Sequence, residues 1–393
     1  MKPDLSPVQT GLEIFLAEHS RTYKGRSLAL LANQASIGPG YRHALSYLDE
    51  YLPGRIKAVF SPQHGFKGEK QDNMVESGHG RLKDGRPLFS LYSDLRQPEP
   101  SMLQDIDVLL IDLTDIGTRV YTFAQTMSLC LEAAGDSDLE IVILDRPNPL
   151  GGLTFEGNLL DISCRSFVGR HPMPMRHGLT MGEMAVFFNS QLEKPAALSV
   201  IPCRHWTRDR YFPGTGLPWV MPSPNMPTFE TAWVYPGQVL WEGTNISEGR
   251  GTAKPFLMFG APFIDPEILA GELRSRKLPG AVFREVWFQP TFHKWEGQYC
   301  GGLEIHPLNH NFEPYLTSLT CLEIILKFWS RDFRLKEPPY EYEYTRRPID
   351  LILGRESIFN ELADGRPARE IIEASDRELK KWRRDIKKYL LYS

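Results

Sequence analysis

The sequence contains few cysteines and none of the patterns by which cysteines build a disulfide framework or a zinc site. Five cysteines are spread over 393 residues, and no two of them stand in a C-x-x-C pair. An odd and dispersed set argues against both a disulfide scaffold and a zinc knuckle. The fold must therefore depend on a hydrophobic core, which a composition of 41% hydrophobic residues can supply.

Long apolar runs are also missing. No stretch approaches the ~20 apolar residues that cross a bilayer. Residues 1–20 carry acidic residues early and lack the uninterrupted apolar core of a signal peptide. We therefore expect no membrane insertion and a cytoplasmic location, unless a leader has been removed.

The chain has no excess of positive charge. Its net charge is −4, its pI is near 6.2, and its lysines and arginines are dispersed. We therefore expect no nucleic acid among its partners. The most basic stretch, residues 377–388, interleaves acidic residues and predicts a solvated helix face. The sequence predicts no oligomeric state.

Signatures of nucleotide, flavin and metal sites are absent. The loop at residues 35–40 is not G-x-G-x-x-G, and its proline stands where a phosphate needs free N–H groups. There is no Walker loop and no G-x-S-x-G elbow. His64 and His79 lie near acidic residues, but no H-E-x-x-H spacing accompanies them. We expect no cofactor and no metal.

Strand-like and helix-like segments alternate in the first half of the chain. Parallel sheets are buried on both faces, so their strands appear as continuous apolar runs. Four such runs are followed by polar side chains, and a fifth comes later: Leu28–Leu31, Ile56–Phe60, Val108–Ile111, Ile141–Leu144 and Leu198–Ile201. Helix-like stretches between them are Tyr41–Leu52, Thr122–Ala134 and Thr180–Leu192. The pattern predicts an α/β fold whose ligand lies beyond the carboxyl ends of the strands.

A chain of this length favours two domains. We place the first at residues 1–229 and the second at residues 230–393. The region 211–262 is rich in proline, glycine and tryptophan, and we expect ordered loops without regular elements there. The second domain mixes strand-like and helix-like segments: Ala281–Phe288, Gly302–His306, Thr317–Ser330 and Arg369–Leu391.

Five loops combine polar side chains with prolines and glycines that fix the backbone. They are Ser61–Gly65, Asp115–Tyr121, Asp145–Gly152, Pro222–Pro227 and Glu242–Gly251. One interpretation is a crevice that binds a ligand. The other is that pairs such as Asp145–Arg146 and Glu248–Arg250 only brace the loops. Glu183 has a structural role available, because it stands three residues after Thr180 in the capping-box spacing.

These loops resemble a known family, the bacterial exo-β-N-acetylmuramidases of the NamZ type, formerly the domain of unknown function DUF1343. The resemblance covers nearly everything from Gly11 onward, and it is best in Asp112–Thr122, Asp145–Gly157, Arg176–Glu183, Trp219–Thr228, Tyr235–Phe256 and Lys294–Gly302. It implies a Rossmann-like parallel sheet with helices on both faces, a smaller C-terminal α/β (α+β) domain, and a cleft between them. It also implies release of N-acetylmuramic acid from the non-reducing end of peptidoglycan fragments in cell-wall recycling.

The chain departs from the family pattern at one position. The family usually has Pro-Glu-His-Gly after the second strand, and that glutamate is its favoured catalytic acid. Here the segment reads Pro62-Gln63-His64-Gly65, and an amide cannot transfer the proton that glycoside hydrolysis requires. Glu69 and Asp72 lie nearby in the sequence. We take Glu69 as the leading replacement, provided that it is close and partly desolvated.

A sugar pocket accounts for the remaining polar residues. Glycoside hydrolysis uses two carboxyl groups, or one together with the acetamide of the sugar itself. The candidate catalytic residues are Glu69, Asp115, Gln63, His64 and Tyr121. The candidate substrate-binding residues are Asn33, Arg119, Asp145, Arg146, Asn148, Asn225, Glu242, Glu248 and Arg250, of which an arginine would hold the lactyl carboxylate. Trp219, Trp233 and Trp241 are candidates for stacking on a sugar face.

Two other functions remain open at this point. Gln63 favours a protein that binds a muramyl sugar without cleaving it. A different hydrolase, such as an amidase, is the weaker alternative. Only a muramidase would release free N-acetylmuramic acid from a muramyl-glucosamine disaccharide.

Overall fold

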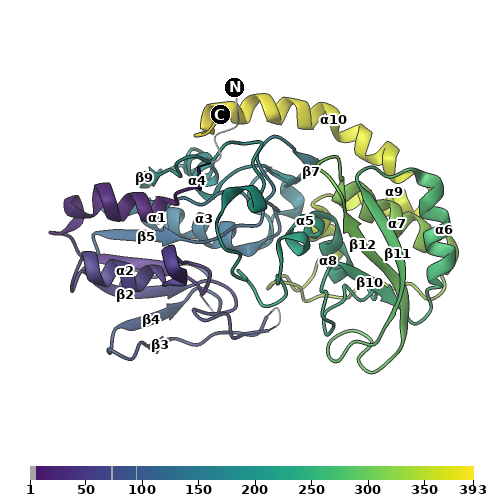
Figure 1. Cartoon of the computed structure of the whole chain (residues 1–393), viewed down its shortest axis with the longest axis horizontal. Coiled ribbons are helices and arrows are strands. Elements are labelled where there is room, and N and C mark those ends of the chain that lie inside the picture. Colours follow the sequence, from purple (N-terminus) through teal and green to yellow (C-terminus); the bar gives the residue numbers. More distant parts are fainter. Residues whose placement is uncertain (1–5, 72–73, 94) are drawn as a thin grey trace.

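A computed structural model describes residues 6–71, 74–93 and 95–393. Its largest sheet has seven strands in the order β3-β4-β2-β1-β5-β6-β9 (Figure 1). All neighbours are parallel except β3 and β4. The strands are β1 (Leu28–Ala32), β2 (Ile56–Ser61), β3 (Gly80–Arg81), β4 (Pro87–Ser90), β5 (Val108–Asp112), β6 (Glu140–Leu144) and β9 (Ala197–Ile201).

Helices cover both faces of this sheet, because successive side chains of each strand point to opposite sides. Leu28 and Leu30 pack with one set of helices, α1 (Gly11–Ile14) and α2 (Ala44–Tyr51). Ala29 and Leu31 belong to the core that includes α3 (Thr122–Ala134) and α4 (Met181–Asn189). The predicted parallel sheet with helices on both faces is confirmed.

The second part of the chain is a smaller antiparallel sheet with helices. Its strand order is β10-β12-β11, and the strands are β10 (Met258–Ala261), β11 (Ala281–Phe288) and β12 (Cys300–Pro307). The helices are α5 (Phe229–Gln238), α6 (Pro266–Arg276), α7 (Pro314–Trp329), α8 (Pro348–Leu353), α9 (Glu356–Ala363) and α10 (Ala368–Asp385). A two-stranded antiparallel sheet of β7 (Glu156–Leu159) and β8 (Pro174–Arg176) contacts this part through α7 and α10.

The prediction of irregular structure throughout residues 211–262 was wrong. This region holds α5 and β10. Helix α5 contains Pro236 in its last turn, and the Thr228 hydroxyl accepts a hydrogen bond from the N–H of Thr231 at the start of the helix. All but one of its residues are buried, so tertiary packing outweighs the poor helix propensity of proline and glycine.

Helix α10 connects the second part of the molecule to the first (Figure 1). Its buried residues are Ala368, Ile371, Ser375 and Trp382, and its charged side chains face solvent. Beyond the helix, the N–H of Leu391 donates to Glu183 and the hydroxyl of Tyr392 donates to Asp145. Among the described residues, no helix combines the length and the hydrophobicity that a membrane crossing requires.

Candidate active site

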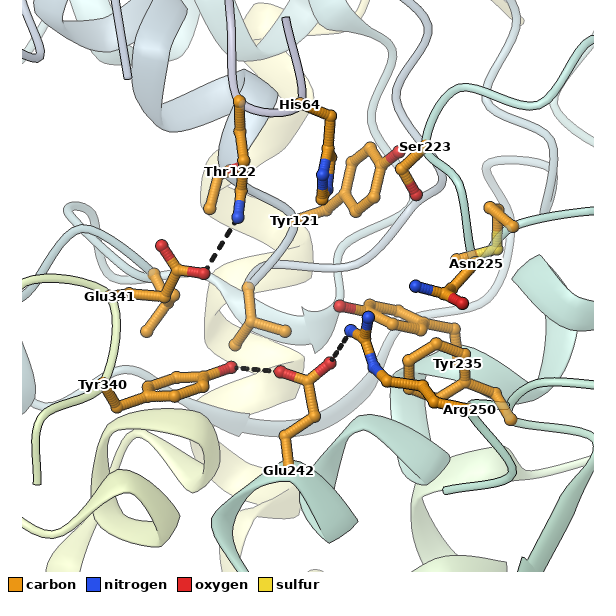
Figure 2. A pocket seen from close by; sticks show the side chains of 15 residues that line it. His64, Tyr121, Thr122, Ser223, Asn225, Tyr235, Glu242, Arg250, Tyr340 and Glu341 are labelled. Carbon is orange, nitrogen blue, oxygen red and sulfur yellow. Dashed lines mark hydrogen bonds and ion pairs between the residues drawn. The ribbon is translucent and has the colours of Figure 1, made fainter. Parts of the chain in front are cut away.

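A small pocket lies where the two parts of the chain meet, and both parts line it (Figure 2). Its volume is about 30 Å³, which is room for roughly two water molecules. Its polar lining residues are Gln63, His64, Tyr121, Thr122, Ser223, Asn225, Tyr235, Glu242, Arg250, Tyr340 and Glu341. The loop after β2 and the start of α3 supply the first four, as expected for the carboxyl edge of a parallel sheet.

The amide of Gln63 is held from three directions. Its nitrogen donates to the hydroxyl of Tyr92 at 2.9 Å and to a carboxyl oxygen of Glu341 at 3.0 Å. Its oxygen accepts a hydrogen bond from the hydroxyl of Thr122. The turn that places it has positive φ angles at the next two residues, 71° at His64 and 82° at Gly65. Gln63 is therefore a fixed neighbour of the Glu341 carboxyl group.

Glu341 is 3% exposed and sits on an unusual backbone. Its φ is 47° and that of Tyr342 is 65°, a left-handed conformation that side chains other than glycine and asparagine rarely adopt. Burial raises the pKa of Glu341 to about 7, although the hydrogen bonds from Tyr92 and Gln63 act in the opposite direction. Burial therefore favours the protonated form of this carboxyl group.

Glu242 is the second carboxyl group of the pocket, and its surroundings differ. Figure 2 shows it between Arg250 and Tyr340, each of which lies 2.7 Å from one of its oxygens. A guanidinium in direct contact favours the charged form of a carboxyl group. The pocket thus combines an ion-paired carboxylate with a carboxyl group that readily holds a proton.

Glu248 lies behind Arg250 and extends the charge network. Burial alone would raise its pKa, but Lys294, Arg250 and His293 together lower the pKa of Glu248 to about 2. The ammonium group of Lys294 lies 2.8 Å from one carboxylate oxygen, and Arg250 lies 3.0 Å from the other. Glu248 is therefore a permanent anion that fixes the position of Arg250.

Several predicted site residues do lie in this pocket. Gln63, His64, Tyr121, Asn225, Glu242 and Arg250 line it, and Glu248 lines a neighbouring cavity that shares Glu242 and Arg250. His64 contacts the carbonyl of Lys70 at 2.7 Å. Asn225 exchanges two hydrogen bonds with Gln71, at 3.1 and 3.2 Å. These two side chains connect the loop after β2 to the pocket wall.

The predicted arginines are occupied by protein partners. Arg119 donates to four backbone carbonyls, those of Asn158, Met173, Ile352 and Leu353, and does not line the pocket. Arg146 forms a buried ion pair with Asp112. Arg250 has two carboxylate partners. Of the three, Arg250 lines the pocket, and a role for it in holding a lactyl carboxylate stays a prediction.

Three polar residues at the ends of strands serve the fold instead of the pocket. The carboxylate of Asp145 accepts from Thr180, from the N–H of Gly182 and from Tyr392. The amide of Asn148 bridges Leu179 and Leu150, and that of Asn33 donates to the carbonyl of Pro222. The prediction that the 145–148 loop shares one continuous cleft with Gln63 was wrong, because these side chains turn inward. Arg146 lines a separate cavity of about 230 Å³ together with Trp219.

Glu69 and Asp115, two of the candidate catalytic residues, also lie outside the pocket. Glu69 is exposed, and its carboxylate accepts from the N–H of Lys67, so the condition of partial desolvation is not met. Asp115 is buried beside His177 at 3.2 Å and caps the N–H of Gly117. Asp72 lies outside the described residues. Trp241 is fully buried against Phe259, and Trp233 is in the core.

Sequence reasoning missed Glu341, Tyr340, Tyr92 and Tyr235. Three of these four lie far from the strand ends that directed the search. The segment Pro338–Tyr344 does carry a signal, since it alternates acidic and aromatic residues directly after two prolines. A rigid segment that carries both aromatic side chains and carboxylates is typical of a loop that lines a site. Among the residues that the structure describes, no group of three or more histidine, cysteine or acidic side chains is arranged for a metal ion.

The fold and the pocket define a class of protein: an α/β chain in two parts with a pair of buried carboxyl groups between them, as in many glycoside hydrolases. Residues 28–230 match the family model described as the N-terminal part of exo-β-N-acetylmuramidase NamZ. Residues 233–392 match the model of its C-terminal part. The chain belongs to this family, and the resemblance found in the sequence is confirmed.

Relatives of known sequence or structure agree with this assignment. A peptidoglycan β-N-acetylmuramidase NamZ of Bacillus subtilis is 38% identical over 386 residues, which cover 98% of this chain and 91% of that protein. Two DUF1343 family proteins of Bacteroides fragilis have similar crystal structures. One has a TM-score of 0.89 at 28% identity and the other 0.78 at 27%, and both alignments cover at least 98% of each chain.

Proposed function

We propose that this protein hydrolyses the glycosidic bond of a terminal β-N-acetylmuramic acid, and so releases that sugar from the non-reducing end of peptidoglycan fragments. One observation carries the proposal. The pocket with two buried carboxyl groups is built jointly by the regions that match the N-terminal and C-terminal NamZ models. A pair of carboxyl groups in different surroundings is the arrangement that glycoside hydrolysis uses. Cell-wall turnover is the process that this reaction would serve.

The direct test uses a disaccharide in which N-acetylmuramic acid is linked β-1,4 to N-acetylglucosamine. We expect the protein to release both free sugars, which chromatography separates. The disaccharide with the reverse order, glucosamine at the non-reducing end, is the matched control and should remain intact. Cleavage of both disaccharides, or of neither, would reject an exo-acting muramidase.

Gln63 supports a second candidate function, a protein that binds muramyl sugars without cleaving them. An amide at this position cannot donate a proton to the glycosidic oxygen. Calorimetry with the same disaccharide distinguishes the two functions. Heat of binding without release of N-acetylmuramic acid over many hours would establish a binding protein, whereas release during the titration would establish the hydrolase.

A further inference from the structure

The two carboxyl groups of the pocket have unequal partners. Glu242 contacts the guanidinium of Arg250, whereas Glu341 receives hydrogen bonds from the neutral groups of Tyr92 and Gln63. No ion pair joins Glu341 to a lysine or arginine among the described residues. This difference in partners makes Glu341 the candidate acid of the pocket.

The hydrogen bonds around Glu341 are compatible with a protonated carboxyl group. The hydroxyl of Tyr92 accepts from Gln63 and from the N–H of Met74, so its own hydrogen points to Glu341, 2.6 Å away. Gln63 donates to the other oxygen of Glu341. Each carboxyl oxygen has two acceptor positions, and each of these bonds uses one. A lone pair therefore remains for a transferable proton.

Glu341 also borders a larger space. Glu341 lines both the small pocket and an open cavity of about 590 Å³. The small pocket has room for water but not for a sugar ring. Arg96, Arg165 and Phe167 line the larger cavity, and guanidinium groups suit the carboxylates that muramyl fragments carry. The larger cavity, unlike the small pocket, has room for a sugar chain.

Glu341 and Tyr342 both have a left-handed backbone conformation. Residues other than glycine keep such a conformation only where the surrounding structure holds it in place. Strain of this kind is common at functional sites. Both residues line the larger cavity, and Glu341 also lines the smaller one.

We infer that Glu341 is the proton donor of this site and that Gln63 is a positioning residue that holds it. The inference rests on the proposed hydrolase function. When the bond between C1 and the glycosidic oxygen breaks, its electron pair goes to that oxygen, which takes the Glu341 proton and leaves as a hydroxyl group. Water then bonds to C1 and gives a proton to the Glu341 carboxylate, which restores the acid. Glu242, which is ion-paired with Arg250, stabilises the positive charge that develops at C1.

The test compares the wild type and Glu341→Gln on two substrates. The first is the muramyl-glucosamine disaccharide, whose leaving hydroxyl needs a proton. The second is a 4-nitrophenyl β-N-acetylmuramide, whose leaving group does not. We expect kcat on the disaccharide to fall by about 100- to 10,000-fold, and kcat on the nitrophenyl substrate to fall by less than about 10-fold. Glu69→Gln, a change at an exposed glutamate outside the pocket, is the matched control and should leave both rates unchanged.

Other outcomes would overturn the inference in different ways. An equal loss on both substrates would indicate a structural role for Glu341. Unchanged rates in Glu341→Gln would remove it from the mechanism, while the hydrolase would stand. Activity that is absent in the wild type and appears in Gln63→Glu would show that the acid belongs at position 63. A wild type inactive on both substrates, with Gln63→Glu inactive as well, would overturn the proposed function itself and the role of Glu341 with it.

Discussion

Asp112 and Arg146 form an ion pair at the carboxyl end of β5, and both side chains are buried. One nitrogen of Arg146 lies 2.9 Å from Asp112, and the same nitrogen donates to the carbonyl of Ile37. The pair fixes the loop after β1 to the end of β5. If one of the two charges were removed, the other would remain unpaired in a medium of low dielectric constant, which is strongly unfavourable.

Asp112→Asn should therefore lower the free energy of unfolding by about 3–5 kcal/mol, because it leaves a buried guanidinium uncompensated. Urea denaturation of the variant and the wild type gives this difference. The matched control is Asp136→Asn, which breaks the exposed pair with Lys194 and should cost less than about 1 kcal/mol. Equal losses in the two variants would contradict a special role for the buried pair.

The surroundings of Glu156 predict how the stability of the fold depends on pH. It accepts the N–H groups of Tyr315 and Leu316 at the start of α7, and burial raises its pKa to about 7. An acid whose pKa is higher in the folded state stabilises the fold while protonated, and this stabilisation is lost as the pH rises through about 7. Relative to Glu156→Gln, the wild type should therefore lose about 1 kcal/mol of stability between pH 6 and pH 8. A difference that is independent of pH would contradict the raised pKa.

The residues of the site show what a sequence can and cannot reveal. Gln63, His64 and Glu242 could be predicted because they follow apolar runs or lie in loops fixed by glycine and proline. Glu341 could not be ranked above Glu69, because distance along the chain says little about distance in space. The amide of Gln63 contacts a carboxyl group 278 positions away in the sequence, while Glu69, six positions away, faces solvent.

Strands and long helices were the most predictable elements. The five apolar runs of the parallel sheet became β1, β2, β5, β6 and β9 because continuous burial imposes its own sequence pattern. The strand-like segments Ala281–Phe288 and Gly302–His306 likewise became β11 and β12. Helix α5 was missed because its proline and glycine obscure a helix that packing stabilises. The short strand β4 carries too few apolar residues for its pattern to be distinctive.

The capping box at the start of α4 connects this helix to Asp145, directly after β6. The hydroxyl of Thr180 accepts from the N–H of Glu183 and donates to Asp145. Thr180→Ala should destabilise the protein by about 1–2 kcal/mol, since it removes a helix cap and one donor to a buried carboxyl group. Thr180→Ser retains the hydroxyl and should cost less than half as much. Thermal denaturation with both variants gives the comparison, and equal losses would assign the effect to the lost methyl group.

At the scale of the whole molecule, the segment after α10 returns to the first sheet. The hydroxyl of Tyr392 donates to Asp145 and accepts from the N–H of Cys203. Tyr392→Phe should lower the free energy of unfolding by about 1–3 kcal/mol, because it leaves buried polar groups without a partner. The rate of disaccharide hydrolysis per folded molecule should not change, since Tyr392 is remote from the pocket. Tyr344→Phe, at a side chain that is 65% exposed, is the control and should be neutral.

The contact between Tyr392 and Asp145 also bears on the order of events during synthesis. The ribosome synthesises the strands of the sheet well before residues 391 and 392. Until then, Asp145 lacks one of its hydrogen-bond donors. Domains that emerge first usually fold first. Here, however, Asp145 beside the sheet receives the hydrogen bond of Tyr392 only from a segment translated some 190 residues after β9. Stalled or prematurely terminated chains would therefore lack this hydrogen bond, although all strands of their sheet have been made.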